Sequence, residues 1–271
     1  MIERVPAPTA TEVVRFDDGS STRVDRYGER GPVVLGVHGI TSSRKSWARL
    51  GERLASTHRL YAFDQRGHGD RATTLGPMTL ERSRRDLAAV AASLPSPVDL
   101  LVGHSWGGAV VLSGAAAVKP ARVLAIDPMI RVEPGTFRAD YVDELRELFA
   151  LRGEARERAI REMYAALDPV DREAKVHAML GMSSEALERL GDENRVDEGG
   201  WDLREQLVAY PFPLLVHLAG EDSVVSPDDL RVLRERGGSN VAIETFEGEG
   251  HNLHRTAFDR FAESLAAFAS S

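Results

Sequence analysis

The hydrophobic residues of this chain gather in short continuous runs that alternate with amphipathic segments. Runs of this kind, bounded by turn residues, are typical of buried parallel strands, and they fall at 33–37, 59–63, 99–104, 122–126, 213–218 and 241–246. Helical patterns separate them, near 45–57, at 79–94, directly after 105 and at 256–268. Residues 12–27 alternate around Asp18-Gly19, which predicts an antiparallel hairpin. The alternation predicts an α/β fold, with a mostly parallel central sheet and helices on both faces.

The alternation of strand and helix patterns is interrupted between residues 129 and 205. The segment is charged and lacks strand-like runs, and its patterns predict four helices at 141–151, 154–167, 171–180 and 184–190. We therefore expect an α/β core of residues 1–128 and 206–271, interrupted by a helical insertion of residues 129–205. The insertion holds 19 acidic and 12 basic residues, which places −7 of the net charge of −8 there. The simplest interpretation of its charged helix faces is solvated surface.

Composition narrows the possible classes of protein. A chain of 271 residues with 28% charged and 42% hydrophobic residues fits an ordinary globular domain. The lack of cysteine excludes disulfides, cysteine-bound zinc and a thiol nucleophile, and it fits a reducing compartment. The negative charge argues against nucleic acid as a partner. With no signal-peptide pattern and no uninterrupted apolar span, we expect a cytoplasmic protein without a membrane span; the histidine spacings predict no metal site.

The first candidate for a catalytic residue is Ser105. It stands in Gly103-His-Ser-Trp-Gly107, where an apolar strand runs directly into a helix of small residues. A sharp turn at this place lifts the serine oxygen clear of the sheet edge, and the flanking glycines avoid clashes in the turn. The same turn aims the N-terminus of the next helix at negative charge that forms on a substrate. The pattern predicts that Ser105 is a nucleophile.

Three other segments end predicted strands at the same edge of the sheet, where open parallel sheets bind ligands: His38-Gly-Ile-Thr41, Gly220-Glu-Asp222 and Gly248-Glu-Gly-His251. A serine hydroxyl needs a base to remove its proton, and a histidine base needs an acid on its other nitrogen. His251 and Asp222 supply these groups for Ser105. The backbone N–H groups of Ile40 and Trp106 are the expected donors to the oxyanion.

Together these segments and Asp64-Gln-Arg-Gly-His-Gly69 resemble the α/β-hydrolase superfamily, in its serine-nucleophile branch with a helical cap. The resemblance implies that the insertion covers the active site. In many relatives the acid lies three residues after the glycine that matches Gly220, and this chain has Ser223 there. Asp222 lies one residue before this position. Some relatives take their acid from the preceding core strand, so Asp127 is the alternative, with Glu221 third.

The function that follows is hydrolysis of a carboxylic ester through an acyl-serine intermediate, with a small-molecule substrate and no cofactor. We expect a small to medium acyl group, mostly uncharged or apolar, since an acidic cap disfavours highly anionic substrates. The same triad also permits hydrolysis of lactones, thioesters, C–C bonds and N-terminal peptide bonds, and perhydrolysis; a binding protein without turnover is the other class. His38 and His104 flank the expected pocket as structural residues. Its apolar candidates in the insertion are Met163, Tyr164, Met179, Met182 and Trp201. The sequence fixes neither the substrate nor the oligomeric state.

Overall fold

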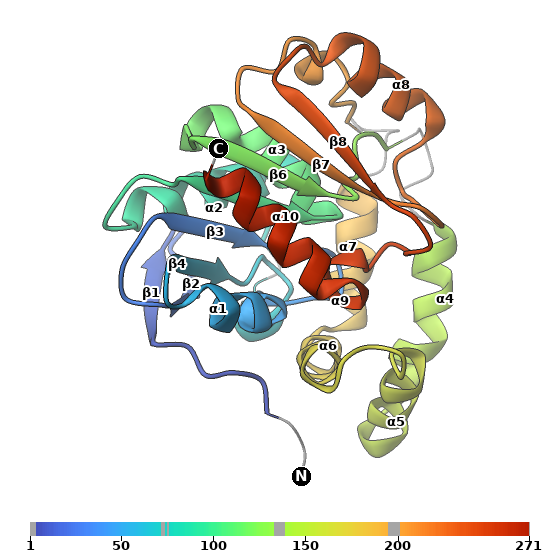
Figure 1. The fold of residues 1–271 in the computed structure, drawn as a ribbon. Helices are drawn as coiled ribbons and strands as arrows, with labels where there is room; N and C mark the ends of the chain where they lie inside the picture. The colour runs from blue at the N-terminus through green and yellow to red at the C-terminus, as the bar shows by residue number, and fades with distance from the viewer. Residues whose placement is uncertain (1–3, 72–73, 75, 133–138, 195–200, 271) are drawn as a thin grey trace.

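An eight-stranded sheet forms the centre of the computed structural model, which describes residues 4–71, 74, 76–132, 139–194 and 201–270 (Figure 1). The strand order is β1-β2-β4-β3-β5-β6-β7-β8. β1 pairs antiparallel with β2, β2 pairs antiparallel with β4, and all later neighbours are parallel. The strands are β1 Ala10–Arg15, β2 Ser21–Tyr27, β3 Val33–Val37, β4 Arg59–Phe63, β5 Leu100–His104, β6 Arg122–Ile126, β7 Leu214–Ala219 and β8 Val241–Phe246. This confirms the predicted α/β fold.

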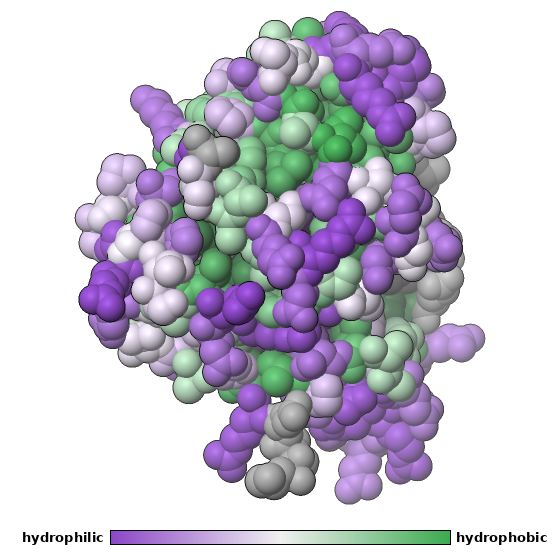
Figure 2. All heavy atoms as spheres, viewed as in Figure 1, coloured by the Kyte–Doolittle hydropathy of each residue, from purple (hydrophilic) through white to green (hydrophobic). Residues whose placement is uncertain are grey.

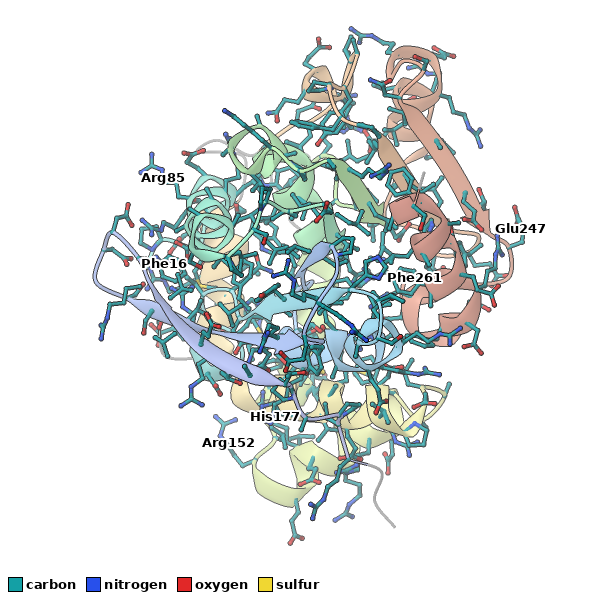
Figure 3. The ribbon with its side chains drawn as sticks, turned by 60° about the vertical axis from the view of Figure 1, so that its left-hand side comes forward. Phe16, Arg85, Arg152, His177, Glu247 and Phe261 are labelled. Atoms are coloured by element: carbon teal, nitrogen blue, oxygen red, sulfur yellow. The ribbon has the colours of Figure 1, made fainter. Side chains whose placement is uncertain are left out.

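Helices cover both faces of the sheet because successive strand residues point to opposite sides. In β3, Val33, Leu35 and Val37 pack with one group of helices, and Val34 packs with the other. The first group is α2 Leu80–Ser93, α3 Trp106–Val118 and α8 Pro227–Arg236; the second is α1 Ala48–Leu54, α9 Leu253–Thr256 and α10 Phe258–Ser270. Figure 3 shows Phe261 of α10 turned toward the sheet, whereas Arg85 and Glu247 lie at the periphery.

The described residues of the charged insertion form four α-helices between β6 and β7: α4 Ala139–Ala150, α5 Gly153–Met163, α6 Pro169–Gly181 and α7 Ser184–Glu193. Where the chain leaves and re-enters the core, Arg131 and Asp202 form an isolated antiparallel bridge. Asn194 accepts a hydrogen bond from the N–H of Leu80, which ties the end of α7 to the core. Figure 2 shows mostly hydrophilic side chains over α5. The division into core and cap domains stays a prediction.

Two elements differ from the expectation. The segment at 45–57 is a 3₁₀ turn, Arg44–Trp47, followed by the short α1. The sequence reasoning also missed α8, which begins with Pro227 at its first position and with the Ser226 hydroxyl accepting from the N–H of Asp229. A serine before a helix and a proline at its first position are ordinary helix-start signals, so the start of α8 was predictable from the sequence. Among the described residues, no helix combines the length and apolar character needed to cross a membrane.

Candidate active site

Ser105 occupies a strained turn between β5 and α3. Its φ and ψ of 56° and −117° lie outside the helical and extended regions, and its N–H donates to the carbonyl of Ile126 at 2.9 Å. A Cβ atom on Gly103 would stand 2.2 Å from the carbonyl oxygen of Gly107, and one on Gly107 would stand 2.2 Å from that of Val37. Only glycine fits at either place, which is the physical reason for the pattern around Ser105.

The side chain that pairs with His251 is Asp127. His251 lies in the loop after β8, and its Nδ1–H donates to Oδ2 of Asp127, the residue directly after β6, at 2.6 Å. The expectation that Asp222 makes this contact is wrong. Asp222 is exposed and lies in the wall of the neighbouring pocket. The alternative acid of the sequence analysis is therefore the one whose carboxylate the fold brings to the histidine.

The carboxylate of Asp127 is fully buried and satisfied from several sides. Besides His251, it accepts hydrogen bonds from the Ser223 hydroxyl at 2.6 Å and from the N–H groups of Val224 and Ala219 at 3.1 and 3.2 Å. Burial alone would raise the pKa of Asp127, but these bonds, led by that from His251, hold it below its ordinary value. Ser223 stands where many relatives carry the acid, and here it is a donor to the acid that follows β6.

The backbone segments of the expected oxyanion site flank Ser105. Trp106 is the first residue of α3, and the first N–H groups of a helix point out of its end. On the other side, a Cβ on Gly39 would lie 3.1 Å from Cβ of Ser105, so the chain at Gly39 and Ile40 passes close to the serine. Ile40, Ser105 and His251 line one pocket.

Gln65 joins these two segments, and sequence reasoning had not singled it out. Its amide nitrogen donates to the carbonyl of His38 at 2.5 Å, and its amide oxygen accepts from the indole nitrogen of Trp106 at 3.1 Å. The signal was present, because Gln65 lies within the run from Asp64 to Gly69 that carries part of the resemblance. A single buried side chain thus fixes the distance between the loop after β3 and the start of α3.

His38 and His104, both expected beside the pocket, differ in their relation to it. His38 does not belong to the pocket wall: its Nδ1–H donates to the carbonyl of Gly39 at 2.9 Å, and its Nε2 accepts the N–H of Gln65 at 3.1 Å. Burial lowers its pKa to about 4. His104 lines the pocket, and its Nε2–H donates to the carbonyl of His251 at 2.9 Å. Burial, followed by the nearby His254 and His251, lowers the pKa of His104 well below its ordinary value. Both shifts favour the neutral form of the ring.

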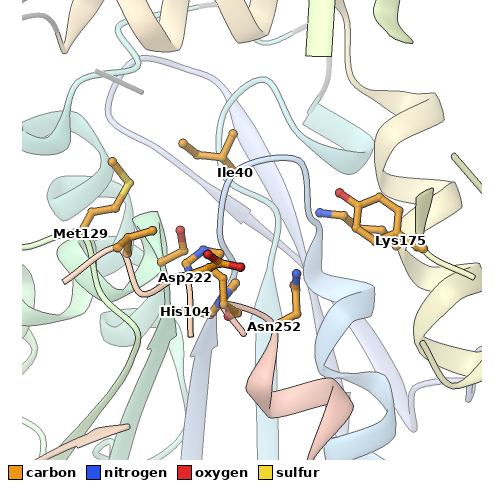
Figure 4. Close-up of a pocket in the computed structure, with 10 residues that line it drawn as sticks. Ile40, His104, Met129, Lys175, Asp222 and Asn252 are labelled. Carbon is orange, nitrogen blue, oxygen red and sulfur yellow. The ribbon is translucent and has the colours of Figure 1, made fainter. Parts of the chain in front are cut away.

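The pocket above Ser105 has a volume of about 240 Å³ (Figure 4). Of the candidates in the insertion, Tyr164 lines it and the others do not. Met163 is 51% exposed, while Met179 and Met182 are buried in the core, and the Trp201 ring packs 6.0 Å from that of Trp106. Ten residues line the pocket: Ile40, His104, Ser105, Met129, Tyr164, Lys175, Asp222, Val224, His251 and Asn252. Sequence reasoning missed Met129, Lys175, Val224 and Asn252.

Within the described ranges, no group of three or more His, Asp or Glu side chains is placed to hold a metal ion. The polar groups of the pocket are instead a hydroxyl, two imidazoles, a phenol, an amide, a carboxylate and an amine. Such a set suits proton transfer and hydrogen bonding to an organic substrate.

Comparison with known proteins agrees with this geometry. The sequence model of the alpha/beta hydrolase family matches residues 34–264. An N-formylmaleamate deformylase of Pseudomonas putida is 26% identical over 253 residues, covering 90% of each chain. A pimeloyl-[acyl-carrier protein] methyl ester esterase of Xanthomonas campestris is 29% identical, covering 89% of this chain and 96% of its own. The structure of an esterase from Exiguobacterium antarcticum superimposes with a TM-score of 0.76 at 20% identity, covering 97% of this chain and all of that one.

Proposed function

Because this chain belongs to the alpha/beta hydrolase family, we propose that it hydrolyses a carboxylic ester through an acyl-serine intermediate. Ser105 is the nucleophile, His251 the general base and then acid, and Asp127 the acid that orients His251. The observation that carries the proposal is the hydrogen bond of His251 to the buried Asp127, in a loop that shares one pocket with the strained Ser105. Esterases and lipases among the relatives support a carboxylic ester hydrolase.

The reaction follows from the positions of these groups. The bond to Asp127 keeps the proton of neutral His251 on Nδ1, so Nε2 accepts the proton of the Ser105 hydroxyl as its oxygen attacks the ester carbonyl. The N–H groups of Ile40 and Trp106 stabilise the oxyanion of the tetrahedral intermediate. When it collapses, His251 gives the proton to the leaving alcohol and the acyl group stays on Ser105. Water then attacks the acyl group as His251 takes a proton from it, and His251 returns that proton to the Ser105 oxygen as the acid leaves.

Asp127 is suited to its part because it stays ionised. Its pKa lies below the ordinary value of a carboxyl group, which favours the charged carboxylate at neutral pH. The charge stabilises the imidazolium that forms during attack, in a place fully shielded from water. Its other hydrogen bonds prevent the carboxylate from rotating away from His251.

A second candidate differs only in the bond that is cleaved. The deformylase of P. putida covers nine tenths of both chains, and a formyl amide demands the same nucleophile, base and oxyanion donors as an ester. The lactone, thioester, C–C, peptide and perhydrolysis alternatives remain predictions of the shared triad. A cytoplasmic location remains a prediction from composition and from the pattern at the N-terminus. Binding without turnover is the outcome that would displace all of them.

The test is hydrolysis of p-nitrophenyl esters from acetate to decanoate by wild type and by Ser105→Ala. Loss of the nucleophile is expected to lower kcat by about 10⁶-fold. Ser113→Ala is the matched control, because Ser113 is a buried serine of α3 whose hydroxyl donates to the carbonyls of Ala109 and Val110 within the helix. It is expected to keep wild-type kcat. Folded wild-type protein that leaves every ester and a formyl amide intact would refute the proposal.

A further inference from the structure

Lys175 of α6 reaches into the pocket from the insertion, where sequence reasoning had expected apolar side chains (Figure 4). Only 5% of it is exposed. Its amine donates a hydrogen bond to the Thr41 hydroxyl at 2.8 Å and lies 4.9 Å from the centre of the Tyr164 ring. Thr41 in turn donates to the carbonyl of Ile40 at 2.7 Å. The amine is therefore hydrogen-bonded to the residue that follows Ile40, and the N–H of Ile40 is an expected oxyanion donor.

A buried amine normally has a carboxylate beside it. Among the described residues, no carboxylate lies within 4.0 Å of its nitrogen, and the charge that acts on it most is that of Arg255, a second cation. Burial and Arg255 together lower the pKa of Lys175 well below its ordinary value. Asp222 lines the same pocket, but its carboxylate is exposed and makes no ion pair with Lys175. The amine has three donors, and the Thr41 hydroxyl uses one of them.

We propose that Lys175 binds a carboxylate group carried by the substrate, so that the ester cleaved at Ser105 is a monoester of a short dicarboxylic acid. The inference rests on the proposed function and names its substrate class. A substrate carboxylate would supply the missing countercharge and accept the remaining donors of the amine. Since Lys175 is joined through Thr41 to the segment of Ile40, that carboxylate lies a few bonds from the scissile carbonyl, on the acyl side, and the cavity of about 240 Å³ admits only a short chain.

This substrate class revises the expectation of an uncharged acyl group. That expectation used the total charge of the insertion, which is −7. Two acidic side chains of α5 and α6, Glu157 and Glu173, pair with Arg161 on the outer side of these helices. The pocket meets the amine of Lys175 from one of the same helices, α6. Local placement therefore decides which substrate charge is favoured.

The test compares two methyl esters that differ only in charge. Monomethyl glutarate carries the carboxylate, and methyl 5-methylhexanoate has an isopropyl group in its place. Lys175→Met removes the charge at similar length, and Lys175→Gln also keeps a donor for Thr41. For both variants we expect kcat/KM to fall about 10- to 100-fold on monomethyl glutarate and less than about threefold on the neutral ester. Lys119→Met, at an exposed lysine, is expected to change neither.

Equal losses on the two esters would overturn the proposal, because they would mean that Lys175 acts only by holding Thr41. Failure of wild type to hydrolyse either ester would contradict the proposed function instead. Calorimetry then decides the inference independently, with the two intact esters on Ser105→Ala, which leaves them uncleaved, and on Ser105→Ala combined with Lys175→Gln. Monomethyl glutarate is expected to bind Ser105→Ala at least tenfold more tightly than methyl 5-methylhexanoate, and to lose that advantage in the double variant. Equal affinities of the two esters for Ser105→Ala would overturn the inference.

Discussion

Replacing Asp127 by asparagine tests the central contact of the site. Asparagine has the same shape, so the residue still fits its buried place. Its amide carries two N–H donors where the carboxylate accepted hydrogen bonds from four groups. If the nitrogen faces His251, it meets the Nδ1–H and the N–H of Val224, and His251 must move its proton to Nε2. If it faces the other way, it meets the N–H of Ala219, and His251 keeps its tautomer without a charge beside it.

The expected loss follows from either orientation. With the charge centres about 4 Å apart and an effective dielectric constant of about 20, the carboxylate stabilises the imidazolium by about 4 kcal/mol. Removing it lowers kcat by about 10³-fold. The wrong tautomer raises the loss to about 10⁴-fold, because Nε2 then has no lone pair for the serine proton. We therefore expect kcat of Asp127→Asn to fall by about 10³- to 10⁴-fold.

The assay measures kcat on p-nitrophenyl acetate for wild type, Asp127→Asn and Asp222→Asn. Asp222 is the matched control, because it is the other aspartate of the pocket edge and its side chain is exposed; its variant is expected to keep at least a third of wild-type kcat. Urea unfolding shows whether each variant is folded. The reasoning is refuted if Asp222→Asn loses 10³-fold while Asp127→Asn keeps a tenth or more of wild-type kcat.

Three further predictions test the scaffold of the site. Gly107→Ala places a Cβ 2.2 Å from the carbonyl oxygen of Val37, so the urea midpoint should correspond to a loss of about 3 kcal/mol or more, and an unchanged midpoint would contradict the crowding. Gln65→Leu removes the link between the loop of His38 and the Trp106 indole; we expect kcat to fall about tenfold with KM nearly unchanged, and a change confined to KM would count against this role. The pKa of His38 is about 4 when folded and 6.5 when unfolded, so the stability it confers is complete above pH 6.5 and is lost as pH falls toward 4. Its share of the unfolding free energy should fall by about 2 kcal/mol between pH 7 and 5, and His38→Asn should lose this part of the slope.

The features that the sequence predicted well are those that depend on neighbouring residues. A buried parallel strand needs a continuous apolar run, and the turn at Ser105 needs glycines at 103 and 107, so both are visible in a short window of the chain. The acid was harder, because Asp127 and Asp222 each follow a strand at the same edge. Which of the two turns inward toward His251 depends on the packing of β6, β7 and the loop after β8, which no local pattern encodes.

The pocket side of the insertion was least predictable, because the docking of a helix decides which of its faces meets the site. Met163 and Tyr164 are adjacent at the end of α5, yet Tyr164 lines the pocket and Met163 is 51% exposed. Neighbouring helical positions point about 100° apart, so knowing that a helix forms leaves the pocket residue undetermined. An apolar side chain in the insertion therefore indicated that the residue is buried, but it did not indicate that the residue contacts the substrate.

Lys175 did leave a signal in the sequence. The buried residues of α6 include Asp171, Ala174, Lys175 and Ala178, which follow the helical spacing of a face packed on a core. Asp171 on that face is paired with Arg49, whereas the amine of Lys175 donates to a hydroxyl and lies over the Tyr164 ring. A charged residue at an apolar position of a helix costs stability unless something compensates it. In a chain with 34 basic residues and only three lysines, the one lysine of the insertion stands on its buried face. Because no carboxylate of the described residues lies within 4.0 Å of this buried amine, a ligand explains its placement better than the fold does.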